Sequence, residues 1–179
     1  MAHTQAGVRP ALPARFRVGS DTLNRQLYEG FMQHCDAPGV KKTHLFHGRY
    51  ENIYLDEHHV PALGSLLSLV RGKAETLLQR RDLAIGCWFN HMPPQALTTR
   101  HNHDDGFELL SAVYYVRVPA NSGKLILHGD PVQRITPEAG LLLFFPPTLD
   151  HEVSPNHSDE HRLSIAFNIG PDFHAEHRS

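Results

Sequence analysis

The feature that most constrains this chain is a change of hydrophobic period near position 83. Before it, apolar residues such as Leu23, Leu27 and Phe31 recur at helical spacing, which predicts amphipathic helices. After it, short apolar runs alternate with turn signals at 119–123 and 137–140, which predicts many short strands. The order predicts a mainly β fold with N-terminal helices, a sandwich or jelly roll with the helices covering one sheet.

The expected helices have recognisable ends. Ser20 or Asp21 caps the first helix, which stops at 36–39, and Pro61 stands near the start of a second, which ends near 79–82. The strands are expected at 83–89, 109–118, 124–128, 141–145 and 163–169.

The length of 179 residues predicts a single domain over residues 1–179. Within it we expect a loose N-terminal arm over 1–19, helical support over 20–82 and a jelly-roll core over 83–170. A formal net charge of −2 and the absence of a basic run argue against a nucleic-acid partner. The longest wholly apolar run, 141–147, is too short to span a bilayer. Two cysteines, with no signal-peptide pattern, favour a cytoplasmic location.

A metal site is predicted at the mouth of the 109–118 strand. His103 and Asp105 are two positions apart, and side chains at i and i+2 of an extended segment point the same way. His151, far along the chain, would supply a third ligand. Two histidines and one carboxylate with open positions are the ligand set of non-haem Fe(II) oxygenases. We therefore predict His103, Asp105 and His151 as catalytic metal ligands.

His101 offers a second register, because His101 and His103 are also two apart. With His151 they would form an all-histidine site, nearer to that of a cupin. We favour Asp105 because a carboxylate balances the charge of Fe(II), which would leave His101 outside the set of ligands.

An anion-binding pair is expected on the last strand. Arg162 lies eleven residues after His151, and Ser164 shares its strand face. A guanidinium clamps a carboxylate in bidentate fashion, and the hydroxyl adds a donor. Tyr114 and Tyr115 lie on opposite faces of the 109–118 strand, so one of them could donate to the same carboxylate.

Substrate contacts are predicted from two polar segments. Trp88 and Asn90 alternate onto one face of their strand, and Arg49 and Asn52 belong to the 48–55 segment. Each of these residues could instead serve packing or structure.

Residues 101–168 resemble the 2-oxoglutarate- and Fe(II)-dependent oxygenases, especially a small bacterial and phage branch whose strand reads Ser-Gly-Val-Tyr-Tyr-Val. The corresponding residues here are Ser111, Ala112, Val113, Tyr114, Tyr115 and Val116. The branch's later segments resemble 140–146, 151–156 and 162–168, whereas the first 80 residues match only in helical character. Many branch members read His-x-His before the strand, where ungapped counting places His103 and Asp105.

The resemblance implies a double-stranded β-helix, the jelly-roll form also found in cupins. It implies Fe(II) at His103, Asp105 and His151, and 2-oxoglutarate and O2 as co-substrates, with 2-oxoglutarate held by Arg162 and Ser164. Related prolyl-hydroxylase-like enzymes use the second tyrosine of such a pair, which favours Tyr115. The implied activity is a dioxygenase that couples decarboxylation of 2-oxoglutarate to succinate and CO2 with hydroxylation or a related C–H oxidation.

The substrate is expected to be small, amino-acid-like or tethered to a carrier, and a homodimer is expected only from its general frequency. Two other classes stay open. A cupin-like metalloenzyme, or a zinc hydrolase, would not need 2-oxoglutarate. A non-catalytic jelly-roll binding or sensor module would bind a ligand without producing succinate.

Overall fold

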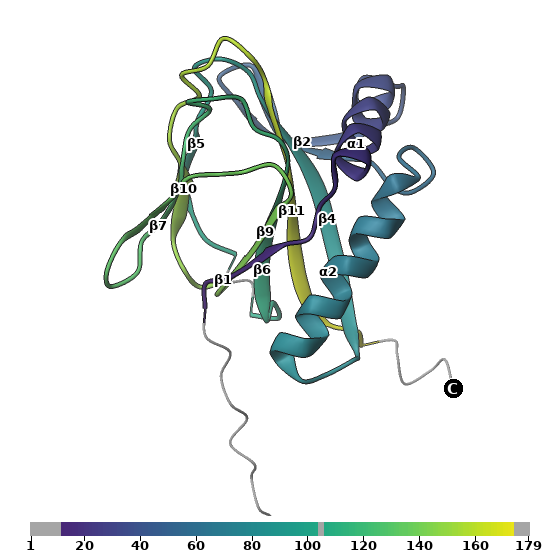
Figure 1. Cartoon of the computed structure of the whole chain (residues 1–179), viewed down its shortest axis with the longest axis vertical. Helices are drawn as coiled ribbons and strands as arrows, with labels where there is room; N and C mark the ends of the chain where they lie inside the picture. Colours follow the sequence, from purple (N-terminus) through teal and green to yellow (C-terminus); the bar gives the residue numbers. More distant parts are fainter. Residues whose placement is uncertain (1–11, 104–105, 174–179) are drawn as a thin grey trace, which may run out of the picture.

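The computed structural model describes residues 12–103 and 106–173 as two β-sheets with two helices on one side (Figure 1). The larger sheet has the strand order β1-β9-β6-β11-β4-β3-β2, and the smaller has the order β5-β10-β7-β8. Every strand pairing in both sheets is antiparallel. The strands are β1 (Ala14–Arg17), β2 (Lys41–Phe46), β3 (Arg49–Tyr54), β4 (Leu83–Met92), β5 (Thr98–His101), β6 (Leu110–Arg117), β7 (Leu125–Leu127), β8 (Gln133–Ile135), β9 (Leu141–Phe145), β10 (His151–Val153) and β11 (Arg162–Pro171).

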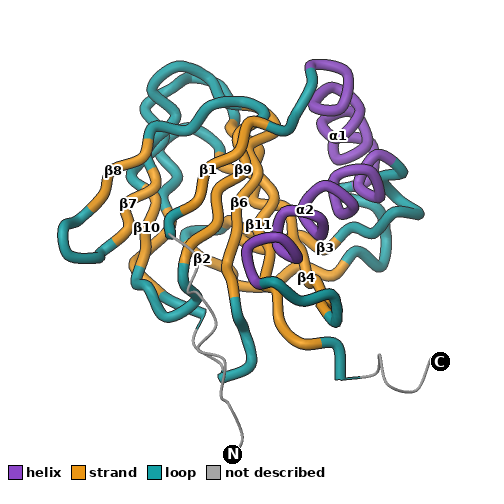
Figure 2. Tube along the Cα trace, turned by 60° about the horizontal axis from the view of Figure 1, so that its bottom comes forward, coloured by secondary structure: helices purple, strands orange, loops and turns teal. Residues whose placement is uncertain are grey.

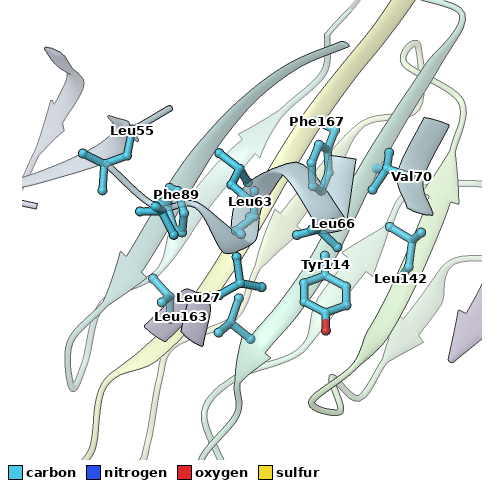
Figure 3. Packing of buried hydrophobic residues seen from close by; sticks show 14 of the residues in the cluster. Leu27, Leu55, Leu63, Leu66, Val70, Phe89, Tyr114, Leu142, Leu163 and Phe167 are labelled. Carbon is cyan, nitrogen blue, oxygen red and sulfur yellow. The ribbon is translucent and has the colours of Figure 1, made fainter. Parts of the chain in front are cut away.

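The two helices begin where the sequence predicts and cover the outer face of the larger sheet (Figure 2). In α1 (Asp21–His34), the hydroxyl of Ser20 accepts a hydrogen bond from the backbone N–H of Leu23, which caps the helix. Helix α2 (Ala62–Leu78) follows Pro61. Figure 3 shows side chains from both helices packed on the sheet, with Leu27 and Leu66 among the fully buried ones. No helix in the described part of the chain is long and apolar enough to cross a bilayer.

The central strands divide their side chains between two environments because neighbouring strand residues point to opposite faces. On β11, Leu163 and Ile165 join the core beneath the helices, whereas Arg162 and Ser164 line a cavity on the other face. Strand β6 divides in the same way, with Tyr114 in the core and Tyr115 in the cavity. The larger sheet therefore has an apolar core on one face and a polar cavity on the other.

The expectation of a loose arm is wrong for the end of the 1–19 segment. Residues 14–17 form β1, which pairs with β9 in a continuous register from Ala14 opposite Phe144 to Arg17 opposite Leu141. Phe16 packs edge-on against Phe144, with ring centroids 5.9 Å apart. This long-range pairing leaves no periodic signal in four residues. The rest of the segment, up to residue 11, lies outside the described residues.

Candidate metal and anion site

A cavity of about 510 Å³ opens between the two sheets. Its walls come from the inward-facing residues of β4, β6 and β11 on the larger sheet and of β5 and β10 on the smaller one. This volume suits a small-molecule site, and a few convergent polar groups in such a cavity mark a candidate active site.

Three histidines converge in this cavity. One potential ligand atom from each of His101, His103 and His151 lies within 4.8 Å of the others. His101 and His151 are direct partners in the pairing of β5 with β10. His103 lies just beyond β5, and its backbone N–H donates to the carbonyl of Pro147 at 2.9 Å. Three imidazoles at this separation could hold one metal ion.

Two of these imidazoles are oriented as metal ligands usually are. His101 Nδ1 donates to the carbonyl of Thr99 at 2.8 Å, and His151 Nδ1 donates to the carbonyl of Leu149 at 3.0 Å. A ligating histidine commonly donates its second ring N–H to a carbonyl, which fixes the tautomer and leaves Nε2 for the metal. Burial lowers the pKa of His151 to about 4, and His101 and His103 add to this effect. Its imidazole is therefore neutral at neutral pH, the form that binds metal.

Asp150 joins the two histidine-bearing segments. One carboxylate oxygen accepts from Arg100 Nε at 3.0 Å, and the other accepts from Asn102 Nδ2 at 2.8 Å. Arg100 and Asn102 flank His101, whereas Asp150 directly precedes His151. Asn102 and Arg100 both lower the pKa of Asp150, which keeps it ionised. The contacts of Asp150 with Arg100 and Asn102 were not predicted from the sequence, although an acidic residue next to His151 was a possible signal.

Two of the three predicted metal ligands lie within the described residues, and the third does not. His103 and His151 come together as expected, and His101 completes a set of three with them. Asp105 lies outside the described residues, so its assignment stays a prediction. The described residues thus assemble the all-histidine alternative that the sequence left open.

A buried arginine lies in the same cavity. Only 2% of Arg162 is exposed, and no ion pair joins it to an acidic side chain of the described residues. Its Nη1 donates to the carbonyl of Ser122 at 3.0 Å, whereas its Nε has no hydrogen-bond partner. Burial lowers the pKa of Arg162. An unpaired buried cation is costly, so this arrangement fits an anionic ligand that supplies the missing charge.

Ser164 and Tyr115 lie beside the arginine. Both are buried and line the cavity, and they are opposite each other in the pairing of β11 with β6. The Arg162 guanidinium carbon lies 5.8 Å from the centre of the Tyr115 ring. Tyr114 points the other way, into the core, where its hydroxyl donates to Asn24 of α1.

Three of the four predicted substrate residues line the cavity: Trp88, Asn90 and Asn52. The centre of the Trp88 indole lies 5.7 Å from that of the His103 ring. Arg49 is not a lining residue. It donates to Asn90 Oδ1 at 3.2 Å, to Glu51 Oε1 at 2.9 Å and to the carbonyl of Leu97 at 2.9 Å, so it holds the wall together.

The comparisons with known proteins agree with this geometry. A family model described as "Putative 2OG-Fe(II) oxygenase" matches residues 129–168, a segment that contains His151 and Arg162. A prolyl-4-hydroxylase from Pseudomonas putida is 21% identical, with a TM-score of 0.72, covering 88% of this chain and 91% of that chain. The fold is that of the 2-oxoglutarate- and Fe(II)-dependent oxygenases. The predicted double-stranded β-helix is therefore confirmed.

Two further structures with the 2-oxoglutarate oxygenase fold are similar. One is an oxidoreductase of the 2OG-Fe(II) oxygenase family from Burkholderia pseudomallei, at 16% identity and a TM-score of 0.58, covering 87% of this chain and 94% of that chain. The other is EvdO2 from Micromonospora carbonacea var. aurantiaca complexed with 2-oxoglutarate, at 14% identity and a TM-score of 0.64, covering 88% and 85%. No curated protein matches the chain.

The resemblance to the 2OG/Fe(II)-dependent oxygenases found in the sequence is confirmed by the family match over residues 129–168 and by the shared fold. Such an enzyme uses Fe(II), 2-oxoglutarate and O2. The residues present fit the first two. The cluster of three imidazoles suits Fe(II), and Arg162, which has no acidic partner among the described residues, suits a carboxylate.

Proposed function

We propose that this protein is an Fe(II)- and 2-oxoglutarate-dependent hydroxylase of a small substrate. When bound, the iron supplies the oxidising chemistry, which couples decarboxylation of 2-oxoglutarate to C–H oxidation. The observation that carries the proposal is the location of Arg162. Its buried guanidinium, which has no acidic partner among the described residues, lines the same cavity as three convergent imidazoles. A dicarboxylic acid would satisfy the arginine at one end while its other end reaches the metal.

The residues near Arg162 would bind and orient 2-oxoglutarate but would take no part in its chemical conversion. The unpartnered Nε of Arg162 would donate to the distal carboxylate, and Ser164 and Tyr115 would add hydroxyl donors. Burial raises the pKa of Tyr115 to about 12, so its hydroxyl keeps its proton. The Ser122 carbonyl holds the guanidinium in place. Preorganised donors of this kind fix the orientation of a ligand and exclude water.

The metal would be held by His101, His103 and His151. Support for His101 comes from its backbone-oriented imidazole and its position opposite His151. The competing set replaces His101 with Asp105, as the charge argument from the sequence favours. Trp88, Asn90 and Asn52 would form the substrate wall, with Arg49 as the residue that positions Asn90.

An anaerobic titration tests this function. Fe(II) is added to the protein, followed by 2-oxoglutarate, and the weak visible charge-transfer band of an Fe(II)–2-oxo acid chelate is recorded. We expect a saturable band in the wild type and at least a tenfold weaker affinity for 2-oxoglutarate in Arg162→Ala. A wild-type protein that binds Fe(II) but gives no band would overturn the proposal and favour the cupin-like metalloenzyme.

The same titration identifies the third ligand. His101→Ala should lose Fe(II) binding, whereas Asp105→Ala should keep the band, if the all-histidine set holds the metal. The reverse result would restore the set His103, Asp105 and His151. Succinate formation under O2 then separates a working oxygenase from a binding module.

A further inference from the structure

Two polar side chains at one end of the cavity each carry a buried atom that the proposed binding of metal and co-substrate does not use. Ser111 of β6 and Asn168 of β11 line the cavity and are direct partners across the two strands. Ser111 is only 1% exposed. Neither Ser111 Oγ nor Asn168 Oδ1 has a hydrogen-bond partner among the described residues. Burying unsatisfied polar atoms costs stability, so each such atom calls for an explanation.

Ser111 and Asn168 lie far from Arg162, the proposed binding residue for the distal carboxylate of 2-oxoglutarate. Asn168 follows Arg162 by six residues on β11, which corresponds to roughly 20 Å at the rise of an antiparallel strand. Ser111 precedes Tyr115 by four residues on β6, or roughly 13 Å. A five-carbon acid whose distal carboxylate is held by Arg162 is much shorter than 20 Å. The pair therefore belongs to another ligand, or to another part of the site.

The wall between the pair and the histidine cluster is apolar. Phe145 is the strand partner of Ser111, and its ring centre lies 4.8 Å from that of His151. Val113 and Ala166 are partners of each other two residues along the same two strands, in the direction of Tyr115 and Ser164, and both line the cavity. A ligand anchored at Ser111 and Asn168 would thus extend its carbon skeleton over these side chains towards the metal site.

We propose that Ser111 and Asn168 anchor the substrate through an uncharged group that donates hydrogen bonds, a hydroxyl or a carboxamide. This inference rests on the proposed function and names the substrate class of that site. Asn168 Oδ1 only accepts hydrogen bonds, and Ser111 Oγ can accept or donate, whereas a carboxylate has no proton to donate and would leave Asn168 Oδ1 unsatisfied.

An ammonium group fits the subsite poorly. It would bury its charge close to a divalent metal, and the only acidic side chain among the described lining residues is Glu51. That carboxylate is already paired with Arg49 at 2.9 Å. Burying a charge that has no partner is much costlier than burying a neutral group. The geometry therefore favours a neutral polar head over either charged one.

The proposal is tested with four probes that share a four-carbon chain: butyramide, 1-butanol, butyrate and butylammonium. Zn(II) replaces iron, 2-oxoglutarate is present at saturation, and probe binding is measured by saturation-transfer NMR. We expect butyramide and 1-butanol to bind the wild type and to lose about tenfold in affinity in Ser111→Ala or Asn168→Ala. Preference for a charged probe, or no binding of either neutral probe, would overturn the proposal.

Two controls separate substrate anchoring from other roles. Ser164→Ala, next to Arg162, should weaken the binding of 2-oxoglutarate and leave probe binding unchanged. Ser111→Ala should weaken probe binding and leave 2-oxoglutarate binding unchanged. A Ser111→Ala or Asn168→Ala variant that weakens the Fe(II)–2-oxoglutarate band as much as probe binding would assign the pair to the co-substrate. Ser111→Ala should also unfold at the same or a higher urea concentration than the wild type, because it removes an unsatisfied hydroxyl.

If the wild type shows no charge-transfer band, the proposed function fails. If the band is present and the probes bind independently of Ser111 and Asn168, only the anchoring subsite fails.

Discussion

The two faces of the larger sheet are made by the same strands yet differ in what they leave unsatisfied. On the helix-covered face, Tyr114 is buried and its hydroxyl donates a hydrogen bond to Asn24 Oδ1. On the cavity face, the neighbouring Tyr115 is also buried, but it lies beside Arg162, which has no acidic partner in the part of the chain that the structure describes. The Tyr114 hydroxyl is thus satisfied within the protein, whereas on the cavity face Arg162, Ser111 and Asn168 keep polar atoms without a hydrogen-bond partner among the described residues.

The difference suggests that one face of the sheet mainly stabilises the fold, whereas the other mainly binds ligands. Apolar burial supplies most of the favourable free energy of folding, and here it comes largely from Leu27, Leu66 and Phe89 with their neighbours beneath the helices. The cavity face carries Arg162 and Ser111 with unpartnered atoms at some cost. Substitutions on the helix-covered face should therefore change stability, whereas substitutions on the cavity face should change ligand binding.

The largest effect is expected from a substitution in the histidine cluster. His151→Ala removes an imidazole whose Nδ1 is already oriented by Leu149. We expect Fe(II) affinity to fall by ~100-fold or more and succinate production to fall to background, with the urea midpoint almost unchanged. Metal content after dialysis reports Fe(II) binding, and circular dichroism during urea unfolding reports stability. Wild-type iron binding in His151→Ala would remove this residue from the site.

The matching substitution on the helix-covered face is Leu66→Ala. Leu66 belongs to α2 and is fully buried in the core between the helices and the larger sheet, so its truncation should lower the free energy of unfolding by about 2–5 kcal/mol. The 2-oxoglutarate affinity of the folded fraction should stay within about twofold of the wild type. A large loss of affinity with unchanged stability would show that the two faces are not independent.

The adjacent tyrosines give the sharpest matched pair. Tyr115→Phe should weaken 2-oxoglutarate by about tenfold, since it removes one donor, and should hardly change stability. Tyr114→Phe should cost about 1 kcal/mol of stability because it breaks the bond to Asn24, and it should leave 2-oxoglutarate affinity unchanged. Equal effects of both variants on either measurement would contradict the division of the two faces.

The smallest effect concerns pH. Burial, and then the charges of His161 and Arg49, lower the pKa of His91 in the folded protein to about 4, against about 6.5 in an unfolded chain. Between these values the unfolded state binds more protons, so stability should fall as the pH drops from about 6.5 to about 4. His91→Phe should flatten this slope in urea denaturation, whereas the exposed His157→Phe should not.

The period of the apolar residues was enough to predict the helices and the central strands. The predicted strand 141–145 matches β9, Ser20 is the cap of the two candidates Ser20 and Asp21, and the second helix starts after Pro61 as predicted. These features are local, because each depends on neighbours within one or two turns. The i and i+2 rule also predicted that Arg162 and Ser164 share a face, which they do.

Only the tertiary structure decided which of these groups meet. Spacing alone made His101 with His103 and His103 with Asp105 equivalent pairs, and the pairing of β5 with β10 placed His101 opposite His151. Arg49 was predicted to contact substrate, but its partners Asn90 and Leu97, more than 40 residues away, tie it into the wall. The four residues of β1 became a strand only because β9 offered an edge. Long-range pairing brings together residues that no local pattern relates, and for that reason the sequence determined the elements and their chemistry while the fold determined the site.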